Sequence, residues 1–220
     1  MLSLALVVML PLGAEPATTS PAPAPAESRD LQAHGVAMAP AALPGGSLGF
    51  WGTLGAPEVA GGYRQGFSLL EIEAIARFHY LELSGTVEAG VRLAAWKSAR
   101  AVLAPTFSLG LKVNSGVRAF DPFNFGYVAL RPRLGLVASI SVSDVVQILA
   151  TAELPWAIAL NVTGFQVTPT VGGGVEFQLN QKLSLVGLGQ LGVDVIKEPL
   201  GVAVPRLAWA VRLGVGYRLF

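Results

Sequence analysis

The chain has 220 residues, of which 52% are hydrophobic and 13% charged, with a net charge of +1 and no cysteine. Ordinary soluble domains carry about 25% charged residues, so this composition, with a mean hydropathy of +0.56, is typical of a membrane protein. The balanced charge gives no electrostatic reason to expect nucleic acid as a partner. The absence of cysteine excludes disulfides and thiolate metal sites.

The first residues are expected to direct export. An apolar run over residues 2–12, followed by Gly13 and Ala14, resembles a secretory signal, so residues 1–14 are assigned as a signal peptide. No Lys or Arg precedes the run, which leaves the true start codon open. Residues 15–46 are rich in Ala and Pro, and this composition predicts an extended periplasmic linker.

Beyond the leader, no run of about 20 apolar residues could form a spanning helix. The longest uncharged stretch, residues 154–175, is broken by several polar residues and by Pro169. A hydrophobic chain without such runs can satisfy its backbone in lipid only as a closed barrel. We therefore predict an all-β, antiparallel, up-and-down transmembrane β-barrel.

Apolar and polar residues alternate with a period of two from residue 66 onward, which is typical of barrel strands. Eight strands are favoured over residues 66–220, and ten are the alternative. Residues 47–65 also have strand character, at Phe50 and Trp51, but one further strand would give an odd number. They are assigned as a pre-barrel segment. The predicted strands cover 66–78, 80–94, 100–113, 125–142, 145–160, 164–179, 182–195 and 207–220.

The charged residues of these strands share one parity, opposite to the apolar face. A charge on the lipid face would cost about 2–4 kcal/mol at the membrane midplane, so the charged parity must face the lumen. The remaining charges, among them Asp121 and Arg206, fall in or beside predicted turns. The predicted lumen charge network has seven acids and eight bases: Glu71, Glu73, Arg77, Glu82, Glu88, Arg92, Arg100, Lys112, Arg131, Arg133, Glu153, Glu176, Asp194, Arg212 and Arg218.

Four prolines, Pro105, Pro132, Pro155 and Pro169, lie inside four successive predicted strands. Proline cannot donate a ladder hydrogen bond and is normally kept off central strands. Folding the hairpins about the predicted turns brings the four prolines level as a belt. Independent bulges are one interpretation, and a weakened wall that opens sideways to a lipid-like ligand is the other.

The chain ends with alternating apolar residues and a final aromatic, Gly214-Val-Gly-Tyr-Arg-Leu-Phe220. This run resembles the terminal assembly signal of outer-membrane barrels, with Tyr217, Leu219 and Phe220 as its signal residues. Together with the leader and the strand pattern, residues 66–220 resemble small eight-stranded barrels of the outer-membrane-protein-A and -X type. The resemblance implies a bacterial outer-membrane location with a periplasmic N-terminus. It also implies contact with outer-membrane lipids and lipopolysaccharide and recognition by the barrel-assembly machinery.

The candidates for catalysis are weak. Beyond the leader there are two histidines, His34 in the linker and His79 at a turn, with Ser84 and Glu82 near the second. Their spacing does not indicate a hydrolase, and two separated histidines do not indicate a metal site. No catalytic residue, metal or cofactor is predicted.

We expect a non-enzymatic outer-membrane barrel, either structural and envelope-stabilising or a very narrow pore with a salt-bridged lumen. A lipid-binding or lipid-modifying barrel with lateral access is one alternative. A barrel whose surface loops bind a partner is another. The oligomeric state stays open.

Overall fold

The computed structural model describes residues 37–38, 43 and 45–219. The predicted signal peptide, residues 1–14, lies outside the described residues, as does most of the predicted linker. Phe220 of the predicted assembly signal also lies outside them. Within the described part, no helix has the length and apolar character needed to cross a membrane.

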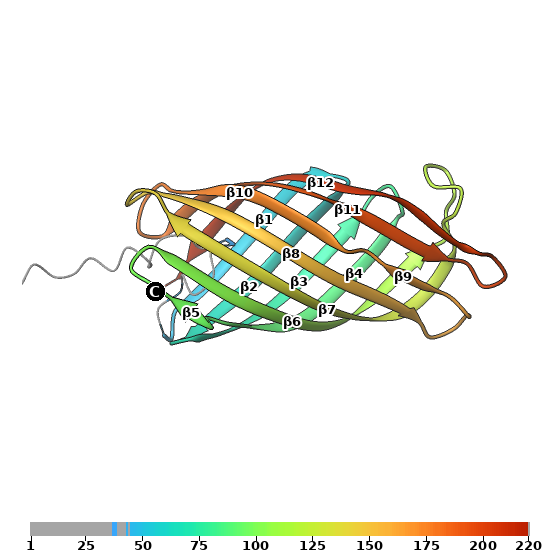
Figure 1. Cartoon of the computed structure of the whole chain (residues 1–220), viewed down its shortest axis with the longest axis horizontal. Helices are drawn as coiled ribbons and strands as arrows, with labels where there is room; N and C mark the ends of the chain where they lie inside the picture. Colours follow the sequence, from blue (N-terminus) through green and yellow to red (C-terminus); the bar gives the residue numbers. More distant parts are fainter. Residues whose placement is uncertain (1–36, 39–42, 44, 220) are drawn as a thin grey trace, which may run out of the picture.

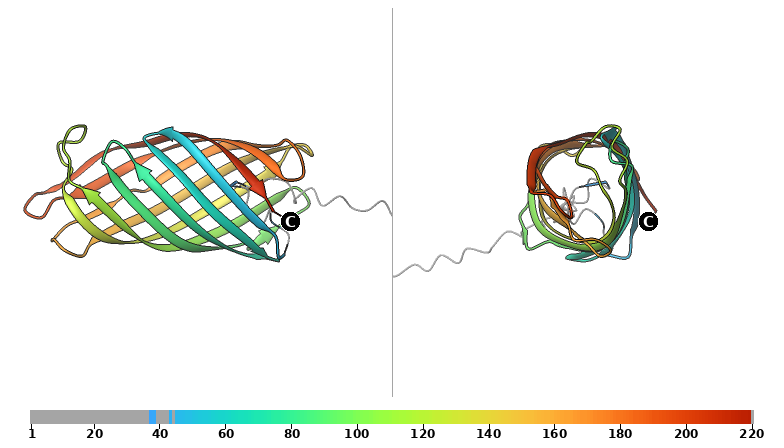
Figure 2. Two further views of the ribbon diagram at one scale, coloured as in Figure 1. Left: turned by 180° about the vertical axis from the view of Figure 1, so that it is seen from behind. Right: turned by 90° about the vertical axis from the view of Figure 1, so that its right-hand side faces the viewer.

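The described strands form one antiparallel sheet that closes on itself, and the wall encloses a lumen along the long axis (Figures 1 and 2). The predicted all-β antiparallel closed barrel is therefore confirmed. In chain order the strands are β1 (Leu48–Ala56), β2 (Glu58–Phe67), β3 (Leu70–His79), β4 (Ser84–Leu93), β5 (Trp96–Lys97), β6 (Ala101–Ser115), β7 (Gly126–Ser141), β8 (Val146–Ala159), β9 (Phe165–Val167), β10 (Thr170–Gln178), β11 (Leu183–Lys197) and β12 (Ala203–Arg218).

We call each strand position around the barrel wall a stave, whether one strand or two collinear strands fill it. The described part of the chain has ten staves, so the favoured count of eight is wrong and the alternative of ten is right. Strands β9 and β10 lie in line between β8 and β11 and form one stave, whereas the short β5 pairs only with β6. The barrel closes where β12 pairs with β1. We call the end where β1 begins and β12 ends the terminal end, and the opposite end the loop end.

The two additional staves come from the segment assigned as pre-barrel, residues 47–65. It contributes β1 and most of β2, joined by a single residue, Pro57. This hairpin is rich in glycine, which weakens the alternation on which the strand prediction depended. One glycine is required by packing: a Cβ on Gly62 would lie 2.7 Å from the side chain of Trp51, its cross-strand neighbour.

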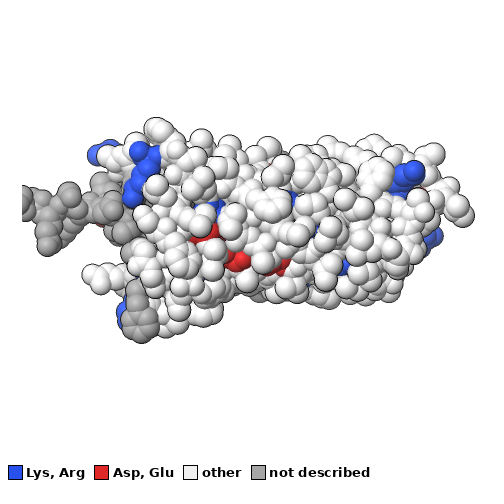
Figure 3. All heavy atoms as spheres, turned by 90° about the horizontal axis from the view of Figure 1, so that it is seen from below, with Lys and Arg blue, Asp and Glu red and all other residues white. Residues whose placement is uncertain are grey.

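The outer face of the wall is apolar. Among the described residues, the charged ones classed as exposed lie in β5 or in turns and loops. Figure 3 shows a mostly uncharged face, with Lys and Arg mainly toward the two ends and some acidic side chains visible near its middle. The acidic residues that lie on strands and form ion pairs have side chains that are at most 16% exposed. Outward aromatics gather toward the terminal end (Phe50, Phe67, Trp96, Phe177, Tyr217) and toward the loop end (Phe78, Tyr80, Phe165, Trp209).

The four prolines do not form the level belt that the sequence predicts. Pro132 pairs with Leu109, four residues along β6 from Pro105, so Pro105 lies apart from the other three. Pro132 lies beside Pro155, because Pro155 pairs with Arg133, and Thr168, next to Pro169, donates to the Pro155 carbonyl at 3.1 Å. The belt is therefore a cluster of three prolines, next to interruptions in the β7–β8 ladder and between β9 and β10.

The rim of the barrel is oblique at the loop end. The last residue of β1, Ala56, pairs with Val211, whereas β12 continues for a further stretch back to Ala203. No described strand pairs with β12 on its β1 side over residues 203–210. Figure 2 shows the same relationship, since β1 and β2 end well short of the tip of the β11–β12 hairpin. We call this gap, between residues 203–210 and the β1–β2 turn, the notch.

Candidate functional site

The middle of the lumen is filled by arginine and glutamate side chains that alternate across the barrel. Arg133 is the centre of this arrangement and contacts three carboxylates: Glu88 at 3.0 Å, Glu153 at 3.2 Å and Glu73 at 3.4 Å. These contacts join β7 to β3, β4 and β8. We call the whole group the central network: Glu58, Glu73, Arg77, Glu88, Arg92, Arg131, Arg133, Glu153 and Arg212.

A charge this deeply buried is tolerated only when it is paired. Arg92 binds Glu73 at 2.6 Å, and Arg131 binds Glu88. The space left between this layer and Met38 is about 10 Å³, roughly the volume of one water probe. At this level the lumen is filled by side chains.

The terminal end of the lumen is occupied by described residues that precede β1 in the chain. The backbone N–H groups of Ala37 and Met38 donate to the carboxylate of Glu176 at 2.7 and 3.0 Å. Arg92 donates to the Met38 carbonyl at 3.0 Å. Ala37, Met38 and Leu43 are all buried. These described residues of the predicted linker therefore lie inside the barrel, and the rest of residues 15–46 lies mostly outside the described part of the chain.

A second charged group lies at the loop end. Arg206 of β12 contacts three carboxylates, those of Glu82 at 2.9 Å, Asp194 at 2.5 Å and Asp121. Lys112 reaches Glu82 from the other side at 2.7 Å. These five residues are the loop-end cluster. They tie β6, β11 and β12 to the β3–β4 turn and the β6–β7 loop.

Glu82 lies in the turn between β3 and β4, outside the strands. Burial alone would raise the pKa of this carboxyl. The charges of Lys112, His79 and Arg206, and the hydrogen bond from Lys112, outweigh burial and hold the pKa of Glu82 well below its usual value. Glu82 therefore keeps its charge in acid that protonates ordinary carboxyls.

Most of the predicted lumen charges are in the lumen, with two exceptions. Arg100 is exposed in the turn before β6, and Arg218 lies at the terminal rim, where it donates to the Gln181 carbonyl at 2.6 Å. Both lie where a strand ends, so parity no longer fixes their direction. The predicted charges that lie inside are Glu71, Glu73, Arg77, Glu82, Glu88, Arg92, Lys112, Arg131, Arg133, Glu153, Glu176, Asp194 and Arg212.

Sequence reasoning missed four charged residues of the lumen. Glu58 and Arg64 lie on β2, which was not predicted as a strand, and Arg64 pairs with Glu71. Arg206 had been assigned to a turn, although extending the inner parity of Arg212 back along β12 reaches it. Asp121 lies in a loop, where no sequence periodicity could have placed it.

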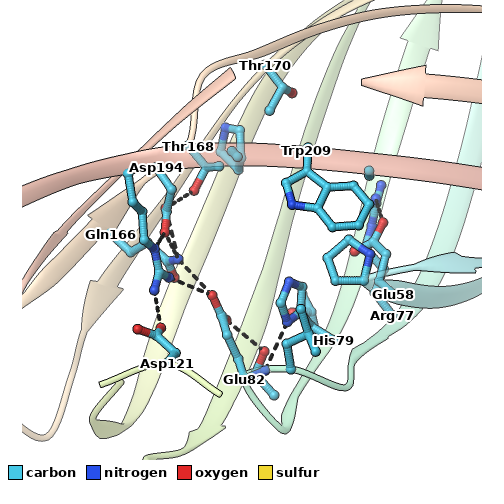
Figure 4. A pocket seen from close by; sticks show the side chains of 18 of the residues that line it. Glu58, Arg77, His79, Glu82, Asp121, Gln166, Thr168, Thr170, Asp194 and Trp209 are labelled. Atoms are coloured by element: carbon cyan, nitrogen blue, oxygen red, sulfur yellow. Dashed lines mark hydrogen bonds and ion pairs between the residues drawn. The ribbon is translucent and has the colours of Figure 1, made fainter. Parts of the chain in front are cut away.

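Above the central network, the loop end encloses a cavity of about 420 Å³ (Figure 4). Its floor includes Arg77, Arg131 and Glu153, and its side includes the loop-end cluster. Apolar residues complete the lining: Pro57, Leu81, Phe120, Pro122, Phe123, Pro155, Leu207, Ala208, Trp209 and Ala210. We call this space the cup.

The residues considered for catalysis line the cup but do not form a relay. The backbone N–H of Glu82 donates to Nδ1 of His79 at 3.1 Å, so that nitrogen acts as an acceptor and is not directed at a serine. Ser84 donates to the Glu82 carboxylate at 3.2 Å. Nucleophilic catalysis requires the base to contact the nucleophile and an acid to orient the base, and these contacts do neither. Among the described residues, no group of acidic or histidine side chains could hold a metal ion.

No family model matches the chain, and no curated protein matches it. Among solved structures, the chain is similar to KdgM porin, with 11% identity, a TM-score of 0.43, and coverage of 79% of this chain and 99% of that chain. It is similar to a structure described as de novo design of transmembrane β-barrels, with 16% identity, a TM-score of 0.35, and coverage of 80% and 98%. It is also similar to OmpT of Vibrio cholerae, with 11% identity, a TM-score of 0.39, and coverage of 74% and 56%. A functional assignment must therefore come from this chain's own residues.

Proposed function

We propose that the chain is a non-enzymatic, integral protein of a bacterial outer membrane whose resting barrel is closed to ions and has a structural role in the envelope. The observation that carries this proposal is the filled lumen. Met38 occupies its terminal end, the central network occupies its middle, and about 10 Å³ remains between them. A very narrow pore is the other outcome of a conductance test.

Membrane insertion is supported by the outer wall. Aromatic residues gather toward both ends of an apolar band, as they do at the two interfaces of transmembrane barrels. The longest connection between staves, residues 116–125, is at the loop end. Long loops face outward in bacterial barrels, so we place the terminal end, where β1 begins and β12 ends, in the periplasm.

Two partners follow from this location. The outer leaflet would bring the loop-end aromatics into contact with lipopolysaccharide, and outer-membrane lipids would cover the rest of the wall. The barrel-assembly machinery would read the last strand. In β12, Tyr217 faces outward and pairs with Phe50 of β1, and the Leu219 N–H donates to the Leu48 carbonyl, so these two residues of the predicted signal lie at the closing seam.

The experiment that tests the location and the fold together is fractionation followed by heat-modifiable migration. The folded protein is expected in outer-membrane fractions, and boiling should change its electrophoretic mobility because a closed barrel resists unfolding by detergent. A protein found in soluble fractions with unchanged mobility after boiling would refute the proposal.

A further inference from the structure

The cup reaches the outer surface of the barrel through the notch. Leu207 and Trp209 are on the outward parity of β12 and are 72% and 44% exposed, yet both line the cup. The β1–β2 turn contributes Pro57 to the opposite side of the same cavity. The cavity therefore opens sideways, at the level of the loop-end aromatics, as well as toward the loops.

The notch is a more complete break in the wall than the cluster of three prolines. At that cluster the broken ladders are still bridged, by Thr168 donating to Pro155 and Val193 donating to Pro169, each at 3.1 Å. On β12, no described strand pairs with the β1-facing edge over residues 203–210. Unpaired backbone is unfavourable in hydrocarbon but acceptable at the interface, where water and headgroups can bind it. The notch is therefore a route between the cup and the headgroup region.

The floor and the side of the cup differ in net charge. Of the central network, Glu58, Arg77, Arg131 and Glu153 line the cup, so the floor presents two guanidinium groups and two carboxylates in balance. The loop-end cluster has two cations, Lys112 and Arg206, and three carboxylates, which leaves one negative charge. A ligand whose head carries an inner anion, for the guanidinium groups of Arg77 and Arg131, and an outer cation, for the excess carboxylate of the loop-end cluster, matches both regions.

We propose that the cup binds the zwitterionic head of a single-chain amphiphile, of the lysophosphatidylethanolamine type, and that the chain leaves through the notch. The phosphate faces the arginines of the floor, the ammonium faces Glu82, Asp121 and Asp194, and the chain passes between Pro57 and Trp209. The volume of about 420 Å³ is within the range of small-molecule sites and suits one head with part of one chain. This proposal is independent of whether the lumen conducts.

The test uses the folded, full-length protein in lipid nanodiscs and a lysophosphatidylethanolamine whose chain carries bromine, which quenches tryptophan on contact. We expect saturable quenching at one probe per barrel. The saturable part should be lost in Trp209→Phe and kept in Trp96→Phe, the matched control, which changes an outward tryptophan at the terminal end. A chain-matched brominated fatty acid lacks the ammonium and should bind about tenfold more weakly, the effect of losing one charge-assisted contact.

A second pair of variants, one that blocks the route through the notch and one control, tests the path of the chain. Ala208→Phe fills the cup beside the notch and should abolish saturable quenching, whereas Ala76→Phe, an outward residue of β3, should not. If Ala208→Phe does not give a heat-modifiable barrel, the comparison of Trp209→Phe with Trp96→Phe decides alone. Unsaturable quenching, or saturable quenching that survives Trp209→Phe, would overturn the site. Equal affinity for the fatty acid would overturn the zwitterionic ligand.

Discussion

The guanidinium of Arg206 donates to the carboxylate of Glu82 at 2.9 Å, although the two residues are 124 positions apart in the chain. The contact joins β12 to the β3–β4 turn across the loop-end mouth. It holds β12, whose edge is open at the notch, to the shorter side of the oblique loop-end rim. The residues that shape the cup are therefore also those that fix the geometry of the mouth.

The Glu82 carboxylate should stay ionised in acid. Because Lys112, His79 and Arg206 hold the pKa of Glu82 below its usual value, the stabilisation that Glu82 provides is fully present above the unfolded pKa, about 4.3. It is lost only as the pH falls further, through the lowered folded value. Carbon NMR of the Glu82 carboxyl should show it still ionised at about pH 4. Lys112→Gln should move its titration upward, and an unshifted midpoint in the unaltered protein would contradict the cluster.

The central network should respond strongly to the loss of one partner. Glu88→Gln leaves Arg131 and Arg133 short of a buried carboxylate, and we expect it to lower the free energy of unfolding by about 3–5 kcal/mol. Glu198→Gln is the matched control, because its pair with Arg118 is largely solvated and is worth about 0–1 kcal/mol. Urea unfolding in detergent micelles measures both. Equal effects of the two variants would show that the central pairs are not buried in solution.

The position of the N-terminal segment can be tested by thiol labelling, because the chain has no cysteine of its own. In Met38→Cys, the buried side chain should be protected from a polar maleimide, while Lys97→Cys, exposed at the same end, should react at once. Adding Glu176→Gln removes the charge that binds the Ala37 and Met38 amides and should expose position 38. Rapid labelling of Met38→Cys without that second change would place the segment outside the lumen.

Amide exchange should distinguish the cluster of three prolines from Pro105. Thr168 and Val193 each donate to a proline that cannot donate in return, so their ladders are held by fewer hydrogen bonds. Their amides should exchange faster than those over residues 103–107, where the β6–β7 ladder is continuous. Uniform protection across both regions would show that the prolines do not weaken the wall.

Much of the wall could be predicted from sequence, because parity is a local property of each strand. The later staves, from β3 to β12, follow the alternation of apolar and polar residues. The hairpin of β1 and β2 did not, because its glycines satisfy packing around Trp51 and carry little hydrophobic signal. Periodicity also gives no information about loops, so the meeting of Asp121 with Arg206 and the burial of Met38 could emerge only from the fold.

We propose that the resting barrel is closed, and single-channel recording in planar bilayers tests this closure most directly. Purified, folded, heat-modifiable protein should give a current no different from that of the lipid alone, because the central network together with Ala37 and Met38 fills the lumen. Stable, reproducible conductance steps from the unaltered protein would contradict the claim and would establish a narrow pore instead.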